Sequence, residues 1–243
     1  MQEKSSPSPF QSRPLHKFFS EVPESYDLVN RLFTLRLDEK WRRMTAKVCL
    51  EDNPKTFMDL GTGTGDLAIR IAKRAGKSIE ITGYDFSEPM LEIARIKADK
   101  AGVGFIRWIH GDAASMPFND GYFDAIGIAY AFRNLTYHNP DTAKYLSEVL
   151  RVLRPGGRFV IVESSQPRSK LLKKLVHLYL EIVVSGIGGK LSGHKSAYHY
   201  LAHSAKNYYN PEEVRNLLLN AGFSHVNHKP LTAGVAGLYT AIK

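Results

Sequence analysis

The chain has a single cysteine, Cys49, and no long apolar run. One cysteine excludes a disulfide within the chain and favours a reducing compartment. No stretch of about 18 consecutive apolar residues occurs, so no membrane-spanning helix is expected. The segment from Met1 to Pro14 is polar and rich in proline and serine, and it lacks the basic and then apolar run of a signal peptide. We therefore expect a cytoplasmic protein.

Acidic residues are outnumbered by basic ones, 24 to 33, which gives a formal net charge of +9. This charge favours anionic partners, either nucleic acid or an anionic membrane surface. A solvated surface with surplus lysine explains the charge equally well. No basic patch with interleaved aromatic residues stands out, so nucleic acid is not an expected partner. No metal site is expected either.

At 243 residues the chain suits one α/β domain with a real core. Residues 1–17 are expected to form a disordered tail, and residues 18–243 a single domain that begins with two helices in 18–50. Strand and helix patterns then alternate, which is typical of a parallel sheet with crossover helices. The expected strands are 55–60, 79–85, 105–110, 122–130, 158–163, 225–231 and 238–243, and the last two are expected to pair antiparallel. This pattern predicts a doubly wound, mostly parallel sheet of seven strands.

The most informative segment is the glycine loop between the first expected strand and its helix, Asp59-Leu60-Gly61-Thr62-Gly63-Thr64-Gly65-Asp66. Gly61, Gly63 and Gly65 allow a tight turn and a close approach of the backbone to a ligand. The following helix N-terminus offers unpaired N–H groups to an anionic group. The next expected strand ends in Asp85, where a ribose diol could be held. This unit predicts a nucleoside site.

The spacing of the glycines separates two kinds of nucleoside ligand. A dinucleotide site has the pattern G-x-G-x-x-G, whereas this loop has G-x-G-x-G with Asp59 two positions before the first glycine. A carboxylate at that position repels a pyrophosphate and suits a ligand with an ammonium group. The loop resembles the first motif of class I S-adenosylmethionine-dependent methyltransferases.

Other candidate residues follow the third and fourth strands, because ligands in open α/β sheets lie beyond the carboxyl ends of the strands. Asp112 and the Ala113 amide suit recognition of adenine. Arg133 and Asn134 lie on a loop directly after the fourth strand and are expected to overlook the methyl group of the cofactor. The alternative interpretations are a helix cap for Asp85 and solvated turns for the other two pairs.

Several motifs together extend the resemblance from residue 18 to residue 243. They are Tyr26-Asp27-x-x-Asn30 with Trp41-Arg42, the glycine loop, Arg133-Asn134 before Thr136, Arg151-Val152-Leu153-Arg154-Pro155-Gly156-Gly157, Ala197-Tyr198-x-Tyr200-Leu201 with Ser204, and Leu231-Thr232-x-Gly234. In this order they resemble the ubiquinone/menaquinone biosynthesis C-methyltransferase family, which has the Rossmann-like fold of class I methyltransferases.

The resemblance implies transfer of a methyl group from S-adenosylmethionine to a ring carbon of a prenylated benzoquinol or naphthoquinol. It implies that Thr64, Asp85, Asp112 and Ala113 bind the cofactor, together with the position of Ala129, where the family commonly has serine. Glycine is common at the position of Ala131. Gly and His are usual at the positions of Arg36 and Asp38.

The chemistry assigns roles to individual residues. Arg133 is a permanent cation with fixed donors, which suits stabilisation of a developing phenolate, and Asn134 can orient the hydroxyl. There are three candidates for the base: His194, His199, and a water molecule polarised by Arg133. Tyr26, Tyr198 and Tyr200 are the expected substrate-binding residues.

Residues 170–208 are expected to form a helical insertion that, with the N-terminal helices, covers the acceptor pocket as a lid. The segment from Leu171 to Val184 mixes an apolar face with lysines. It could hold the isoprenoid tail, at Leu171, Leu175, Val183 and Val184, or lie peripherally in a membrane interface. The alternative functions are a class I methyltransferase for another small molecule or RNA, and a non-catalytic S-adenosylmethionine-binding protein. The ring type, prenyl length and oligomeric state stay open.

Overall fold

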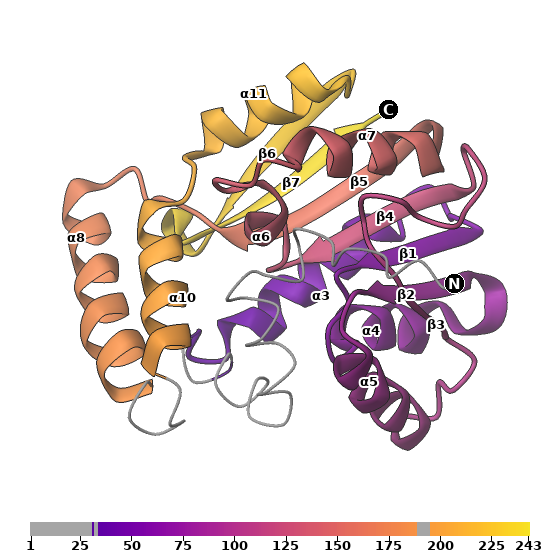
Figure 1. The fold of residues 1–243 in the computed structure, drawn as a ribbon, viewed down its shortest axis with the longest axis horizontal. Coiled ribbons are helices and arrows are strands. Elements are labelled where there is room, and N and C mark those ends of the chain that lie inside the picture. Colours follow the sequence, from indigo (N-terminus) through magenta and orange to yellow (C-terminus); the bar gives the residue numbers. More distant parts are fainter. Residues whose placement is uncertain (1–30, 32–33, 189–194) are drawn as a thin grey trace, which may run out of the picture.

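The computed structural model describes residue 31, residues 34–188 and residues 195–243. Its centre is a seven-stranded sheet of order β3-β2-β1-β4-β5-β7-β6 (Figure 1). The strands are β1 (Thr56–Leu60), β2 (Glu80–Asp85), β3 (Arg107–His110), β4 (Phe123–Ala129), β5 (Leu153–Ser164), β6 (His225–Leu231) and β7 (Ala236–Ile242). The first five strands pair in parallel, and β7 pairs antiparallel with both β5 and β6. The predicted doubly wound sheet and its antiparallel end are confirmed.

Helices cover both faces of this sheet (Figure 1). The helices flanking the sheet are α3 (Leu37–Cys49), α4 (Asp66–Ala75), α5 (Glu88–Lys100), α7 (Thr142–Val152) and α11 (Pro211–Ala221), with short turns η1 (Gly76–Ser78) and η3 (Thr232–Gly234). Neighbouring residues of one strand belong to different cores, since side chains alternate across a strand. Phe57 packs in the core with α3 and α4, whereas Met58 packs in the core with α7 and α11.

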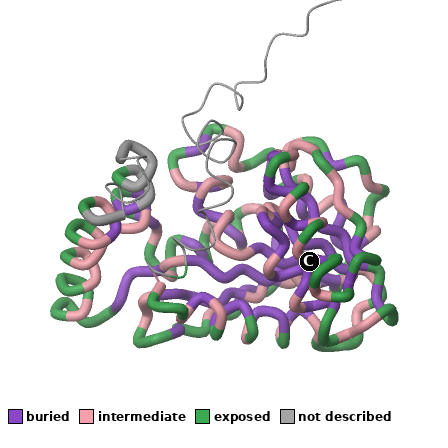
Figure 2. Tube along the Cα trace, turned by 90° about the horizontal axis from the view of Figure 1, so that it is seen from below, coloured by how far each residue is buried: buried purple, intermediate pink, exposed green. Residues whose placement is uncertain are grey.

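Between β5 and α11 the chain leaves the sheet. It forms α8 (Lys170–Tyr179), the π-helical segment η2 (Leu180–Gly188) and α10 (Lys195–Asn207). Both views place α8 and α10 together at one end of the molecule, beside the sheet (Figures 1 and 2). An ion pair between Lys206 of α10 and Glu181 of η2 joins the two sides of this insertion. No helix among the described residues is long and apolar enough to span a bilayer.

Two local elements differ from the expectation. β5 begins at Leu153 rather than Arg158, because Leu153 pairs with Phe123 before a register shift carries the strand past Pro155 and Gly156. Arg133 and Asn134 do not lie on an open loop but in a short helix, α6 (Phe132–Thr136). Phe132 is fully buried and anchors this turn in the core.

Candidate active site

The three glycines of the loop between β1 and α4 all have positive φ, 63° at Gly61, 53° at Gly63 and 83° at Gly65. Their surroundings differ. A Cβ on Gly61 would lie 2.8 Å from the Cβ of Ala131, and one on Gly65 would lie 2.6 Å from the Trp108 ring, whereas one on Gly63 would meet no atom within 4 Å. Gly61 and Gly65 therefore allow close packing, and Gly63 borders open space.

Asp59, at the end of β1, holds this loop together. Its carboxylate is buried and accepts hydrogen bonds from the Thr62 hydroxyl at 2.7 Å and the Ala68 amide at 3.0 Å. Burial raises the pKa of Asp59 from 3.8 to about 7, although the two hydrogen bonds favour the charged form. The loop thus encloses a carboxyl group whose charge is costly until a cation pairs with it.

Asp85, at the end of β2, is a second buried carboxylate. It accepts hydrogen bonds from the Gly63 amide at 2.8 Å and the Ser87 amide at 2.9 Å, and burial raises its pKa from 3.8 to about 6. Asp85 therefore supports both the glycine loop and the turn that begins α5. Asp85 is not the cap of α5, because the N-cap residue is Ser87 and no side chain caps this helix.

These loops surround a cleft, which we call the glycine-loop cleft. Its lining includes most of the predicted cofactor residues, namely Asp59, Gly61, Gly63, Thr64, Asp85, Asp112, Ala113 and Ala129. Asn134 also lines it, while Gly65 does not. The Asp112 carboxylate accepts a hydrogen bond from the Ala114 amide at 2.9 Å, which fixes its loop. Four strand ends meet here, as the strand-end rule predicts.

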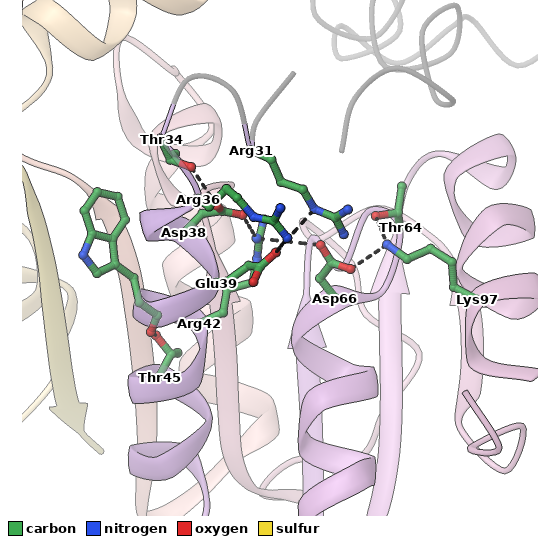
Figure 3. Close-up of polar contacts among 11 residues, drawn as sticks. Arg31, Thr34, Arg36, Asp38, Glu39, Arg42, Thr45, Thr64, Asp66 and Lys97 are labelled. Atoms are coloured by element: carbon green, nitrogen blue, oxygen red, sulfur yellow. Dashed lines mark hydrogen bonds and ion pairs between the residues drawn. The ribbon is translucent and has the colours of Figure 1, made fainter. Parts of the chain in front are cut away.

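A chain of charged residues connects this cleft with the N-terminal helix α3 (Figure 3). Lys97 donates to the Thr64 hydroxyl at 3.0 Å and pairs with Asp66 at 2.5 Å. Arg42 of α3 lies 3.7 Å from Asp66 and pairs with the buried Asp38. The guanidinium of Arg42, which lines the cleft, also lies 4.9 Å from the centre of the Tyr130 ring.

A second cavity, of about 370 Å³, lies beside the cleft, and we call it the apolar cavity. Its apolar walls come from α3, α8, η2 and the turn before β7, with Leu37, Trp41, Leu175, Val176, Leu180, Val184 and Val235 among the lining residues. Tyr130 lines both the apolar cavity and the glycine-loop cleft. The two spaces therefore meet at Tyr130.

Arg133 faces the apolar cavity, whereas its neighbour Asn134 faces the cleft. Arg133 is 7% exposed and donates to Glu163 through its backbone N–H at 3.0 Å and through Nη1 at 3.2 Å. Nη1 also donates to the Ser164 hydroxyl at 2.5 Å. The Nε of Arg133 has no hydrogen-bond partner among the described residues. A buried cation held by Glu163 and Ser164 thus borders the cavity.

His177 is a further titratable group in the apolar cavity. Its Nε2 lies 3.1 Å from Oε1 of Gln166. Burial, and next the charges of Lys173 and Lys206, lower the pKa of His177 below 6.5. The imidazole is therefore neutral at pH 7 and can accept a proton.

Some predicted residues lie elsewhere. Tyr26 and His194 fall outside the described residues, as do residues 1–17 and the side chains of Tyr198 and Tyr200 within α10. His199 is exposed, lies 3.3 Å from the Ser185 hydroxyl and lines neither space. No cluster of three potential metal ligands occurs in the described part of the chain.

The sequence interpretation missed Glu163, His177 and the shared position of Tyr130. Glu163 could have been found, because it is the next-to-last residue of β5 and lies at the same sheet edge as Asp59 and Asp85. His177 carried no comparable signal, since only the folded insertion brings α8 to the sheet.

Comparisons with known proteins agree with this geometry. A model of the ubiE/COQ5 methyltransferase family matches residues 8–243. A demethylmenaquinone methyltransferase of Thermus thermophilus is 42% identical over 221 residues, which are 91% of this chain and 97% of the relative. The ubiquinone/menaquinone biosynthesis C-methyltransferase UbiE of Geobacter sulfurreducens is 38% identical over 230 residues, covering 94% and 88%.

Solved structures share the fold at low sequence identity. A SAM-dependent methyltransferase from Aquifex aeolicus has a TM-score of 0.59 at 19% identity, over 93% of this chain and 97% of that one. An O-methyltransferase family protein from Burkholderia thailandensis has a TM-score of 0.66 at 12% identity, over 94% and 62%. The chain belongs to the ubiE/COQ5 methyltransferase family and is an S-adenosylmethionine-dependent methyltransferase.

Proposed function

We propose that this enzyme transfers a methyl group to a ring carbon of a prenylated quinol, either demethylmenaquinol or a ubiquinol precursor, in quinone biosynthesis. The activities for which its relatives are named support this substrate class. The observation that favours it most is the apolar cavity, which meets the glycine-loop cleft at Tyr130 and borders the buried Arg133. A long apolar tail and a polar ring would both find complementary surroundings there.

The glycine-loop cleft fits S-adenosylmethionine. The open space at Gly63 leaves room for the ligand against bare backbone. Asp85 would accept the ribose hydroxyls, while Asp112 and Ala113 would bind adenine. Asp59 would pair with the ammonium group, which compensates the cost of its buried charge. Gly61, Thr64, Gly65 and Ala129 would complete the cofactor site, with Gly65 acting through the turn itself.

S-adenosylmethionine supplies an electrophilic methyl group when bound. The protein has to make the acceptor carbon nucleophilic, which requires removal of a proton from the neighbouring ring hydroxyl. Arg133 would then stabilise the developing negative charge on the phenolate oxygen, and Glu163 would hold the guanidinium in place through Nη1. Asn134, which faces the cleft, would orient the ring at the boundary of the two spaces.

The proton needs an acceptor, and the apolar cavity offers two. His177 is neutral at pH 7 and lines the cavity. A water bound to Arg133 is the other. After the new carbon–carbon bond forms, the ring carbon loses its hydrogen as a proton to solvent and aromaticity returns. His177 and a water bound to Arg133 are therefore both candidates for the acceptor of the first proton.

Further roles are part of this proposal. Tyr26, Tyr198 and Tyr200 would contact the quinol, and segments 18–50 and 170–208 would act as a lid. In the apolar cavity the lining residues Leu175 and Val184 suit an isoprenoid tail. Leu171 and Val183 do not line that cavity, and Leu171 is 70% exposed, so we assign neither to the tail. The enzyme would work in the cytoplasm, in peripheral contact with the inner face of the membrane.

Mass spectrometry of the quinones of the source organism, with and without the gene, tests the proposal. Loss of one methyl group from the quinone ring on deletion is expected, and the accumulated precursor would name the ring type. An unchanged quinone pool, with methylated RNA or another small molecule missing instead, would refute it.

A further inference from the structure

An apolar stripe runs along the outer side of the helical insertion. Leu171, Leu175, Leu178 and Ile182 are 70%, 55%, 52% and 56% exposed. Their spacing of four, three and four residues places them on one side of α8 and the start of η2. Figure 2 shows exposed positions along this end of the molecule. Four large apolar side chains exposed in one row are unfavourable in water, so this stripe indicates an interaction surface.

Basic residues accompany the stripe. Lys170 and Lys174 are exposed and flank the stripe by helical spacing, whereas Lys173 lies on the side of α8 that carries His177. The nearby carboxylate of Glu181 is already paired with Lys206. The surface therefore combines an apolar row with positive charge, the combination by which an amphipathic helix lies on an anionic bilayer.

The stripe also adjoins the apolar cavity. Leu175 is more than half exposed and at the same time lines that cavity, as do Val176, Tyr179 and Leu180 of the same segment. Leu175 therefore belongs both to the stripe and to the wall of the cavity.

We propose that the stripe of α8 and η2 docks on an anionic lipid bilayer and that the apolar cavity opens there to a membrane-dissolved acceptor. Docking rests on the stripe and its lysines, whereas the acceptor's route rests on the proposed function. Leu171, Leu178 and Ile182 would enter the boundary between head groups and acyl chains. Lys170 and Lys174 would remain at the level of the phosphates.

A bilayer fits this surface better than a second copy of the chain. A stable interface buries about 800 Å² per partner, more than one row of four side chains provides. Two copies of the stripe would also bring the same lysines face to face, and like charges repel. An anionic bilayer complements both the apolar row and the charge.

Co-sedimentation with phosphatidylcholine vesicles, with and without phosphatidylglycerol, tests the docking. We expect Leu171→Ser, Leu178→Ser and Ile182→Ser together to weaken vesicle binding at least tenfold. None of these three lines either space. Ile96→Ser, at a 54% exposed position on α5, is the matched control and should bind as the unmodified enzyme does.

Two double lysine variants test the basic residues beside the stripe. Each lysine near an anionic surface contributes about 1 kcal/mol, so Lys170→Gln with Lys174→Gln should lower binding to phosphatidylglycerol vesicles roughly 30-fold. Lys73→Gln with Lys100→Gln removes the same charge from a basic groove of α4 and α5 and should change binding little. Equal losses from both pairs would overturn the assignment to α8.

Methylation assays separate this proposal from the proposed function. The stripe variant should keep its rate with a short-tailed acceptor in solution and lose rate only with a long-tailed acceptor in vesicles. Unchanged vesicle binding by the stripe variant would refute docking, as would sedimentation that shows a dimer broken by the same substitutions. If docking requires the stripe but no quinol is methylated, the docking stands and the proposed function fails.

Discussion

Asp59→Asn is expected to stabilise the ligand-free protein while weakening cofactor binding. The buried carboxyl has its pKa raised from 3.8 to about 7, so the folded protein holds a proton that the unfolded chain releases. Stability must then fall as pH rises from about 4 to 7, and it levels off above that range. Asparagine keeps an oxygen that can accept from Thr62 and Ala68, and it carries no charge.

The size of the expected stability change follows from the pKa shift of Asp59. Each pKa unit corresponds to about 1.4 kcal/mol, so the part of the shift between pH 5 and pH 7 amounts to about 3 kcal/mol. The free energy of unfolding of Asp59→Asn, relative to the unmodified protein, should therefore increase by about 3 kcal/mol between pH 5 and pH 8. Urea unfolding followed by circular dichroism at several pH values measures this difference.

Asp124→Asn provides the matched control. Burial favours the neutral form of Asp124, yet the amides of Lys55 and Thr56, together with Arg154, lower its pKa overall. Its charge therefore stabilises the fold above the unfolded pKa, and its removal should destabilise the protein at pH 8. The free energy of unfolding of Asp59→Asn, relative to the unmodified protein, should grow with pH. If it does not, the cleft does not enclose a costly charge at Asp59.

Four further substitutions separate binding from chemistry. Asp85→Ala should weaken S-adenosylmethionine binding by roughly 1–3 kcal/mol, because it removes a charged hydrogen-bond acceptor; unchanged calorimetric affinity would exclude Asp85 from the site. Arg133→Lys should lower kcat on the order of 100-fold with little change in cofactor affinity, since lysine lacks the planar donor set; the opposite pattern would place Arg133 in the cofactor site. Glu163→Gln should lower kcat and also the melting temperature, because it breaks a buried ion pair; unaltered turnover would show that Arg133 needs no support. If His177 is the base, the rate should decrease at pH values below the lowered pKa of this histidine, and His177→Gln should remove that decrease; an unchanged pH profile would favour the water instead.

The sheet was predictable because its signals are local. Strand patterns and the glycine loop depend on neighbouring residues, so β1, β2 and the turn into α4 agree with the expected ranges within one residue. The beginning of β5 was less accessible, since Arg154 to Gly157 have the composition of a turn. Pairing between Leu153 and Phe123, distant in sequence, extends the strand through them.

Most residues of the candidate site could be predicted from the sequence, but their division between the glycine-loop cleft and the apolar cavity could not. Arg133 and Asn134 are adjacent, and the sequence suggested that both overlook the cofactor. Because they lie in one turn of helix, α6 directs Asn134 to the cleft and Arg133 to the apolar cavity. His177 and Glu163 reach that cavity from α8 and β5, and only the folded chain brings these elements together.

The most direct test of the central claim is where the transferred methyl group is bonded. The purified enzyme is incubated with isotopically labelled S-adenosylmethionine and demethylmenaquinol, and the lipid extract is analysed by mass spectrometry and nuclear magnetic resonance. We predict one labelled methyl group per ring, bonded to a ring carbon. A label bonded to oxygen, or no label in the quinol under conditions where S-adenosylmethionine binds, would contradict it.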